Sequence, residues 1–307
     1  MKVFVAGATG AIGRPLMERL RAAGHRAFGM VRSRDSEASL AGAGAEAVIG
    51  DALDRNSVLA AVASVRPDVI INELTSLPKH YTPTEMKTAA ERDARVRLEG
   101  NKNLVAAALQ AGVRRFVVQS AAFWYAPGEG LADESESLAF NASPAIAAGS
   151  QRYAELESTI FNHAEFTAVA LRYGFFYGPG TWFTPDGDIG EQVSQQKVPI
   201  IGEGQGVSSW IHIDDAADAT VGSIDCPAGV YNVVDDNPSE QKVWLTAFAR
   251  YCGAPAPPRV SEEQALQAEG PDAVYYATRL RGASNAKAKR ELEFRPRRLE
   301  WLSTGVS

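Results

Sequence analysis

The sequence predicts an α/β fold, a doubly wound parallel sheet with a smaller mixed lobe at the C-terminal end. An apolar strand-like run at residues 3–6 leads directly into a glycine-rich turn, and short apolar runs then alternate with helical patterns as far as Arg172. Beyond Arg172, glycine and proline become frequent and this alternation stops. The chain of 307 residues is long enough for one large core with a small appended lobe.

The turn at residues 7–13 reads GATGAIG and predicts a dinucleotide-binding site of the Rossmann type. Its first glycine permits a tight turn off the strand, the second leaves room for backbone to approach a pyrophosphate, and the third lets the following helix pack against the sheet. The backbone amides at this helix N-terminus would face the anion. The predicted contacts are Gly7, Thr9, Gly10, Ala11, Ile12 and Gly13.

Helices and strands are expected to alternate through the first half of the chain. Apolar residues recur at helical spacing from Ile12 to Ala23, and Gly24 can end that helix. A long helix is expected within 84–111, ending at Gly112. Short runs rich in branched and aromatic residues predict the remaining strands. These are residues 26–31, 47–49, 68–72, 115–120 and 167–171.

The second half of the chain is expected to form a substrate-facing lobe. We predict a Rossmann dinucleotide-binding domain over residues 1–172 and a substrate-binding lobe over residues 173–307, with the chain recrossing between them in a single unit. The lobe's mixed content comes from a predicted strand and three predicted helices. The strand is at 229–234, and the helices are at 189–197, 239–252 and 284–292.

Composition and charge narrow the function classes. A net charge of −6 gives no electrostatic case for binding nucleic acid or an anionic membrane. The chain begins with a strand rather than a leader segment, and no apolar run reaches the roughly 18 residues of a transmembrane helix, so neither secretion nor membrane insertion is expected. Cys226 and Cys252 form no CxxC pair, so we expect no metal site and a reduced, cytoplasmic setting.

Arg32 and Ser33, directly after the second strand, predict NADP rather than NAD. Enzymes that prefer NAD usually place a carboxylate here for the ribose hydroxyls, whereas a guanidinium pairs with a 2′-phosphate and a serine adds a donor. The alternative is that Arg32 and Arg34 are solvated surface residues before an acidic helix.

Further dinucleotide contacts are expected where the next two strands end. Asp51 and Ala52 follow the third strand, where a carboxylate and the next amide can meet the adenine edge, although Asp51 could instead cap a helix. Leu74 and Thr75 follow the fourth strand and are expected to line the crevice in which ligands of open α/β sheets bind.

Seven stretches form a characteristic pattern through their order and spacing along nearly the whole chain. They are GATGAIG (7–13), GDALD (50–54), QSAA (119–122), LRYGFFYGPG (171–180), WIHIDD (210–215), VYNVV (230–234) and SNAKAKREL (284–292). Together they resemble the extended short-chain dehydrogenase/reductases, whose best-known members are nucleotide-sugar epimerases and dehydratases. The resemblance implies that three residues pass against the nicotinamide: Tyr173, Gly174 and Phe175.

The resemblance fails at the residues that usually carry the chemistry. The family uses a tyrosine and a lysine four residues later, the lysine lowering the tyrosine pKa and holding the nicotinamide ribose. This chain has no such pair. We match Tyr153 to the lysine and Gly149 to the tyrosine, because Glu157 then matches an acidic residue of the family. Tyr153 is therefore expected to bond the ribose without being an activated acid, and Arg97 stands where the family often has Asn.

The catalytic candidates are Ser120, Tyr125 and Tyr153. Ser120 ends a central strand, where it would bond a substrate carbonyl or hydroxyl, or else cap the strand. Tyr125 is expected to replace the missing acid, or else to form an aromatic wall. His80, in the loop after the fourth strand, is placed within reach of substrate.

These features predict an NADP-dependent oxidoreductase or epimerase-like enzyme that transfers hydride at a hydroxyl or carbonyl of a small polar or sugar-like molecule, with an atypical proton relay. The alternative is a catalytically silent NADP-binding sensor or regulatory protein. A nucleotide-sugar substrate would need basic groups, for which Arg259, Arg279 and Arg281 are candidates. A homodimer could form through 90–111 and 150–163, whose apolar residues could equally be ordinary core.

Overall fold

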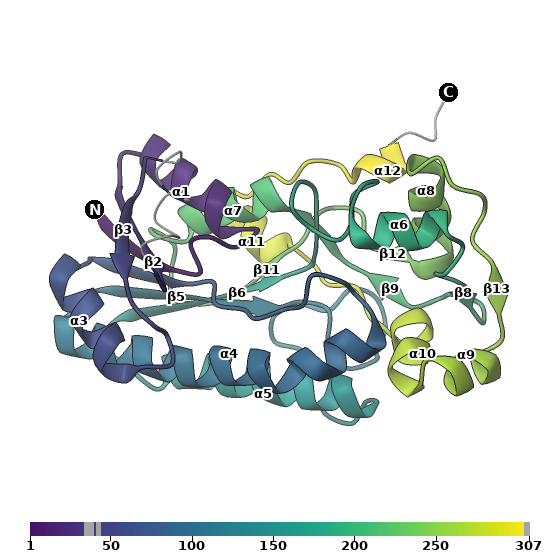
Figure 1. The fold of residues 1–307 in the computed structure, drawn as a ribbon, viewed down its shortest axis with the longest axis horizontal. Helices are drawn as coiled ribbons and strands as arrows, with labels where there is room; N and C mark the ends of the chain where they lie inside the picture. The colour runs from purple at the N-terminus through teal and green to yellow at the C-terminus, as the bar shows by residue number, and fades with distance from the viewer. Residues whose placement is uncertain (34–39, 41–43, 304–307) are drawn as a thin grey trace.

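A seven-stranded parallel sheet runs through the centre of the molecule, as the sequence predicted (Figure 1). The computed structural model describes residues 1–33, 40 and 44–303. The strands lie in the sheet in the following order: β11 (Gly229–Val233), β6 (Thr167–Tyr173), β5 (Arg115–Ala121), β4 (Val69–Asn72), β1 (Lys2–Ala6), β2 (Arg26–Val31) and β3 (Glu46–Ile49).

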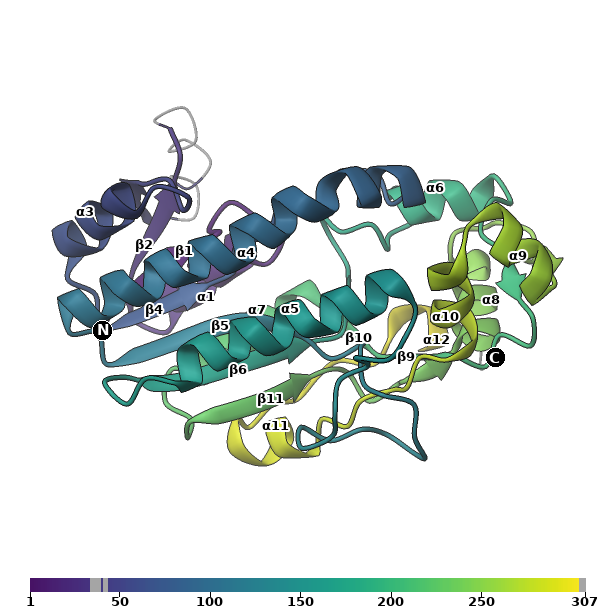
Figure 2. The ribbon, with the colours of Figure 1, turned by 90° about the horizontal axis from the view of Figure 1, so that it is seen from below.

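Helices cover both faces of this sheet (Figures 1 and 2). One face carries α3 (Arg55–Val65), α4 (Pro83–Ala111) and α5 (Pro144–Phe161), the last two lying side by side. The opposite face carries α1 (Gly13–Ala22), α7 (Ile213–Gly222) and α11 (Ala286–Glu291). This three-layer arrangement is the doubly wound architecture.

The central strands are apolar on both faces because each face is covered by helices. Ile70 of β4 packs into the core beneath α3, α4 and α5, whereas its neighbour Ile71 packs into the core beneath α1 and α7, and both are fully buried. Phe116 and Val117 of β5 divide between the two cores in the same way. Period-two alternation therefore builds two separate cores from one strand.

The point where strand order reverses lies between β1 and β4. β1 pairs with β2 on one side and with β4 on the other, so the chain winds outward in both directions from this pair. The carboxyl ends of β1, β4, β5 and β6 lie along one edge of the sheet, which is where ligands of such sheets bind.

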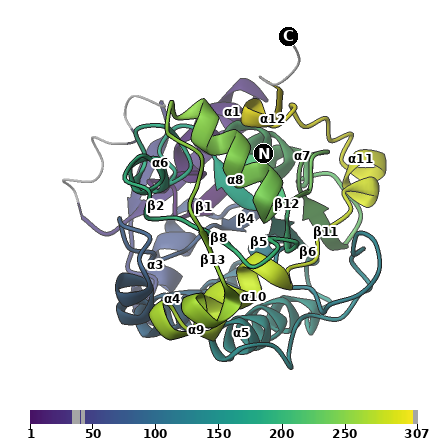
Figure 3. The same cartoon turned by 90° about the vertical axis from the view of Figure 1, so that its right-hand side faces the viewer.

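The remaining elements gather at one end of the sheet and form the smaller lobe (Figures 1 and 3). Its core is aromatic and includes Trp210, Trp244 and Phe248. Its helices are α6 (Asp188–Ser194), α8 (Gln241–Tyr251), α9 (Glu262–Ala268), α10 (Pro271–Thr278) and α12 (Glu300–Ser303). Its short strand pairs are β7 (Phe175–Tyr177) with β10 (Trp210–His212), β8 (Ile200–Ile201) with β13 (Arg259–Val260), and β9 (Val207–Ser208) with β12 (Ser239–Glu240).

After residue 172 the chain leaves the sheet for the lobe and then returns to it. β11 adds the seventh strand beside β6, and α7 packs against α1. The division between residues 172 and 173 stays a prediction. Among the described residues, none of the helices combines the length and the apolar character needed to cross a membrane.

Candidate active site

The glycine turn after β1 is held in place by close backbone packing. Gly7 has φ +90°, and a Cβ there would lie 2.5 Å from the carbonyl oxygen of Glu73. A Cβ at Gly13 would lie 2.2 Å from the carbonyl oxygen of Gly7. At Gly10, in contrast, the one neighbour within 4 Å is that same carbonyl, at 3.2 Å. Gly7 and Gly13 are thus required by the packing of the turn, and exposed Gly10 leaves its outer surface open.

The amino end of α1 faces this open surface without a side-chain cap. Ile12 is the N-cap residue and supplies no side-chain hydrogen bond, and the first turn contains no acidic residue. Thr9 is half-buried beside it, and Ala11 is exposed. Free backbone amides at a helix N-terminus bind anions, so this end of α1 fits the pyrophosphate of a dinucleotide.

The residues predicted for the adenosine end lie at the ends of β2 and β3. Arg32 and Ser33 are exposed directly after β2, whereas Arg34 lies outside the described residues. The carboxylate of Asp51 accepts a hydrogen bond from the Leu53 amide at 3.0 Å. Asp51 is not the cap of α3, because that position is taken by Asp54.

The residue that follows β4 is a buried glutamate, Glu73, at the point where strand order reverses. The Tyr173 hydroxyl donates a hydrogen bond to Glu73 Oε1 at 3.1 Å. Glu73 Oε2 is buried and has no hydrogen-bond partner among the described residues. Burial raises the pKa of this carboxyl to about 8, against the opposing effects of Tyr173 and the Arg97 charge. Leu74, half-buried, and Thr75, exposed, follow it in the loop.

Sequence reasoning missed Glu73, although a signal was present. An acidic residue directly after a fully apolar strand, at the carboxyl edge of a parallel sheet, has to be either solvated or buried beside a site. Only the fold shows that the Glu73 side chain is 3 % exposed.

Ser120 and Tyr125 belong to one buried polar cluster. The Ser120 hydroxyl donates to Glu157 Oε1 at 2.6 Å. Arg172 pairs with both oxygens of Glu157 at 2.7 Å and donates to the Tyr125 hydroxyl at 2.8 Å. The Tyr125 hydroxyl in turn donates to Asn232 Oδ1 at 2.6 Å. Both predicted catalytic hydroxyls are thus engaged inside the protein, and burial raises the pKa of Tyr125.

The α5 positions matched to the family's tyrosine and lysine are Gly149 and Tyr153. A Cβ at Gly149 would lie 2.0 Å from Cζ3 of Trp124, so the indole fills the space beside this glycine. The Trp124 and Tyr153 ring centroids are 5.5 Å apart. The Arg97 guanidinium lies 5.3 Å from the Tyr153 ring centroid and bonds to Asp93 at 2.8 Å. Burial raises the pKa of Tyr153.

An aromatic wall extends from Trp124 toward the lobe. The rings of Phe123 and Phe175 stack with centroids 4.5 Å apart and an interplanar angle of 15°. The Trp124 indole nitrogen donates to the Tyr276 hydroxyl at 3.0 Å. All four of these side chains are only half-buried. Gly174, between Tyr173 and Phe175, has no room for a side chain, because a Cβ would lie 2.6 Å from the carbonyl oxygen of Ser209.

The loop after β4 is tied to the lobe. His80 Nδ1 is 2.8 Å from Asp188 Oδ1, and the Tyr81 amide donates to Asp188 Oδ2 at 2.7 Å. The Trp182 indole nitrogen donates to the Lys79 carbonyl at 2.8 Å. The hydrogen bond to Asp188 raises the pKa of His80. His80 therefore fastens the loop to α6.

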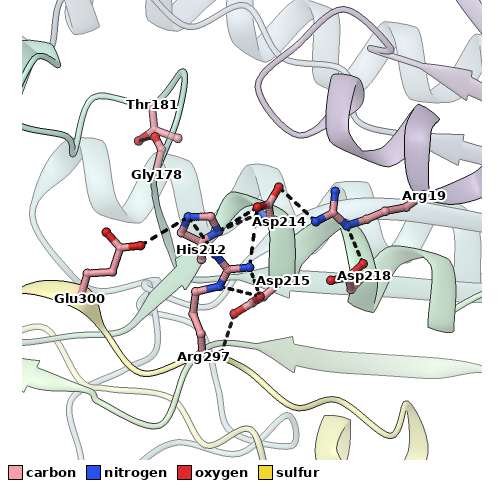
Figure 4. A network of polar contacts seen from close by, with 9 residues as sticks. All are labelled: Arg19, Gly178, Thr181, His212, Asp214, Asp215, Asp218, Arg297 and Glu300. Atoms are coloured by element: carbon pink, nitrogen blue, oxygen red, sulfur yellow. Dashed lines mark hydrogen bonds and ion pairs between the residues drawn. The ribbon is translucent and has the colours of Figure 1, made fainter. Parts of the chain in front are cut away.

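A second polar network lies around the amino end of α7 (Figure 4). His212 caps α7 by accepting a hydrogen bond from the Asp214 amide at 3.1 Å. Asp215 pairs with Arg297 at 2.9 Å, and Asp214 pairs with Arg19 of α1 at 3.2 Å. These contacts fix α7 against α1 and the C-terminal segment. No group of three or more metal-binding side chains occurs within residues 1–33, 40 and 44–303.

The three arginines considered for a nucleotide-sugar diphosphate have different surroundings. The Arg281 guanidinium bonds to the Glu129 and Gly130 carbonyls and to Glu136, which fastens an outer loop. Arg259 and Arg279 are exposed on β13 and after α10.

The family model that matches this chain describes the NAD dependent epimerase/dehydratase family and covers residues 3–233. The chain belongs to this family. It is 40 % identical over 304 residues to a 3-diazoavenalumate denitrifying reductase from a Streptomyces species, with 98 % of each chain covered.

Two solved structures illustrate the shared fold of the NAD dependent epimerase/dehydratase family. UDP-glucose 4-epimerase from Thermotoga maritima has a TM-score of 0.77 at 17 % identity and covers 98 % of this chain and 95 % of its own. The dTDP-glucose 4,6-dehydratase from Streptomyces venezuelae, solved with NAD bound, has a TM-score of 0.72 at 18 % identity, with 99 % and 98 % covered. The family and the reductase relative support an NAD(P)-dependent oxidoreductase or epimerase-like enzyme with a nicotinamide dinucleotide cofactor.

Proposed function

We propose that this protein is an NADPH-dependent reductase that delivers hydride to an aromatic substrate bearing a diazo group and completes the reaction by loss of N2. The full-length relative that is 40 % identical carries the name of a denitrifying reductase for a diazo compound. The observation that carries the proposal is the Trp124 indole beside Gly149. An apolar ring fills the place matched to the family's proton donor, which suits a reduction that needs no proton at that place.

The chemistry balances without an acid. The bound dinucleotide supplies a hydride from its reduced ring. Addition of this hydride to the terminal nitrogen of an arenediazonium ion forms an N–H bond and gives an aryl diazene. The diazene loses N2 as its C–N bond breaks and a C–H bond forms. Two electrons pass to the substrate, and these steps at the diazo group consume no proton. A hydroxyaryl substrate that enters as the diazonium phenolate takes one proton from solvent at its phenolate oxygen.

The aromatic wall supports a planar substrate. Phe123 and Phe175 already stack on one another, and Trp124 and Tyr276 continue the half-buried surface. Aromatic rings prefer offset-stacked or edge-on partners at centroid separations of about 4.5–7 Å. An aryl ring would therefore bind here more favourably than a sugar, which asks for hydrogen-bond partners.

The dinucleotide would lie along the carboxyl edge of the sheet. The donors at this edge fit the parts of the dinucleotide that they were predicted to contact. The amides at the glycine turn and at α1 would hold the pyrophosphate, and Arg32 and Ser33 would hold the 2′-phosphate. Asp51 and Ala52 would contact the adenine. Leu74, Thr75 and residues 173–175 would border the nicotinamide half. We propose NADP over NAD on the strength of Arg32.

We assign positioning rather than catalytic roles to Ser120 and Tyr125. Their hydroxyls are bonded to Glu157 and Asn232 inside the core. Tyr153 is proposed to contact the nicotinamide ribose from α5 without moving a proton. These assignments revise the roles predicted for Ser120 and Tyr125, because a hydroxyl engaged with a buried carboxylate is a poor partner for substrate.

The test uses 3-diazo-4-hydroxybenzoate labelled with nitrogen-15 in the diazo group. Oxidation of NADPH is followed by absorbance, and labelled N2 is followed by mass spectrometry. We expect one N2 per NADPH oxidised, at a rate well above that of the mixture without protein. The alternative function, a dinucleotide-binding sensor, would instead be supported by nucleotide binding without turnover, both of NADPH with diazo and carbonyl substrates and of NADP+ with alcohols.

Homodimer formation and a cytoplasmic setting also remain proposals. The outward face of α4 carries charged residues in ion pairs, Arg95 with Glu99 and Lys102 with Glu155 of α5. Any dimer through α4 and α5 would therefore use polar contacts at this surface rather than an apolar one.

A further inference from the structure

Glu73 is buried and directly follows β4 at the carboxyl edge of the sheet, beside the strands on which the nicotinamide half of the dinucleotide is proposed to lie. Its amide donates to the Ala6 carbonyl at 2.8 Å, which fixes it beside the glycine turn. A Cβ on Gly7 would lie 3.2 Å from the Glu73 Cβ. The Tyr173 hydroxyl reaches it from the end of β6. The carboxyl thus lies between the pyrophosphate turn and the proposed nicotinamide edge.

The groups that act on the Glu73 carboxyl come from β6 and α4. Tyr173 also bonds to Thr220 of α7 at 2.7 Å, and α7 contributes no charged group to this contact. From α4, Arg97 acts on Glu73 through its charge, and Arg97 is itself paired with buried Asp93. Within the described chain Glu73 Oε2 has no partner, although it is buried.

An unpartnered buried carboxyl is costly unless it is neutral or meets a charge on binding. The raised pKa of about 8 keeps Glu73 protonated at neutral pH. A positive charge placed nearby would favour its ionised form. The oxidised nicotinamide ring carries such a charge and the reduced ring does not.

We propose that Glu73 is a proton site coupled to the redox state of the bound dinucleotide. Glu73 is neutral beside NADPH and releases its proton to solvent when NADP+ is bound, so that its carboxylate compensates the charge of the ring. This inference rests on the proposed dinucleotide site. In this role Glu73 stabilises the complex with NADP+, the oxidised product of the reaction, through the charge of its carboxylate.

The experiment measures the affinity of purified protein for NADP+, NADPH and 2′,5′-ADP between pH 6.5 and 8.5 by calorimetry. For NADP+ we expect the Kd to fall about fivefold from pH 7 to pH 8, because a proton leaves Glu73 on binding. For NADPH and 2′,5′-ADP we expect no such fall. Calorimetry of the unaltered protein in two buffers of different ionisation enthalpy counts the proton released directly.

Variants separate Glu73 from other groups. In Glu73→Gln the pH dependence specific to NADP+ is expected to vanish, whereas Glu203→Gln, an exposed loop change, should keep it. In Tyr173→Phe the pH dependence of NADP+ binding should move to higher pH. The hydrogen bond from Tyr173 lowers the Glu73 pKa, so its removal raises that pKa. If NADP+ and NADPH show the same pH dependence and release no different number of protons, the inference fails. If none of the nucleotides binds, the proposed function fails first.

Discussion

The indole of Trp124 occupies the space that a side chain at Gly149 would fill. Cζ3 of Trp124 lies 2.0 Å from the point that a Gly149 Cβ would occupy, so any other residue at position 149 forces the indole to move. Half-buried Trp124 is held by its hydrogen bond to Tyr276, which belongs to α10 of the lobe. The contact couples α5 of the main sheet to the lobe through one ring.

Gly149→Ala is expected to destabilise the protein by about 1–3 kcal/mol through overpacking against Trp124. Chemical denaturation would measure the loss. Gly222→Ala, at the end of α7, is the matched control, since a Cβ there would lie 3.3 Å from the Leu292 carbonyl oxygen and needs only a few tenths of an ångström of adjustment. Equal losses in both variants would contradict the contact.

Arg172→Met is expected to destabilise the protein by about 3–5 kcal/mol, because it leaves the carboxylate of Glu157 buried without its partner. Both side chains of this pair are less than one-tenth exposed. The double variant Arg172→Met with Glu157→Met should recover most of the loss. A single variant as stable as the unaltered protein would show that the cluster does not support the core.

The pH dependence of stability should report Glu73 in the absence of nucleotide. In the unfolded chain the Glu73 carboxyl loses its proton above its ordinary pKa of 4.5, whereas in the folded protein it keeps the proton up to a pH of about 8. The free energy of unfolding therefore falls as pH rises through this window, by up to about 1.4 kcal/mol per pH unit. Glu73→Gln should lack this component.

Urea titrations of the two proteins at pH 5 and pH 8 measure the effect. Asp235, whose pKa burial raises to about 7, contributes in both proteins and cancels in the comparison. A Glu73→Gln stability change that is the same at both pH values would contradict the raised Glu73 pKa.

Arg32→Ala is expected to weaken NADP binding about tenfold and to leave NAD binding unchanged, because a guanidinium pairs with the 2′-phosphate alone. Arg26→Ala, which removes an exposed arginine paired with Glu46, should change neither affinity. Fluorescence titration with both nucleotides measures this. Equal weakening of NAD and NADP would contradict the NADP preference.

Phe123→Leu is expected to raise the KM for an aryl diazo substrate about two- to tenfold by removing the stacked face beside Phe175. Phe140→Leu removes a phenyl ring that is 44 % exposed and serves as the control. Steady-state kinetics measures both variants. An unchanged KM in Phe123→Leu would argue that the substrate does not lie on this wall.

The parts of the fold that depend on local sequence could be predicted, and those that depend on distant contacts could not. The glycine turn is encoded by spacing, and α4 ends at Gly112, φ +66°, as a helix-ending glycine indicates. Glu73 and Tyr173 meet across 100 residues. Ser120 meets Glu157, and Glu157 meets Arg172, only once β5, α5 and β6 have packed.

The site was therefore predicted unevenly. The sequence predicts a site at the carboxyl edge of the sheet, which stays a prediction, and it contains no tyrosine–lysine pair. It did not reveal that the Ser120 and Tyr125 hydroxyls are used internally, nor that Trp124 fills the space beside Gly149. Partners of buried polar groups are set by packing, which a single sequence does not display.

In the proposed reaction, hydride reaches the substrate without a proton delivered from α5. Isotope effects on turnover of 3-diazo-4-hydroxybenzoate test it most directly. We expect a primary isotope effect with NADPH deuterated at C4 and no solvent isotope effect on the same step. A solvent isotope effect that disappears in Tyr153→Phe would show proton donation from α5 and would contradict the account.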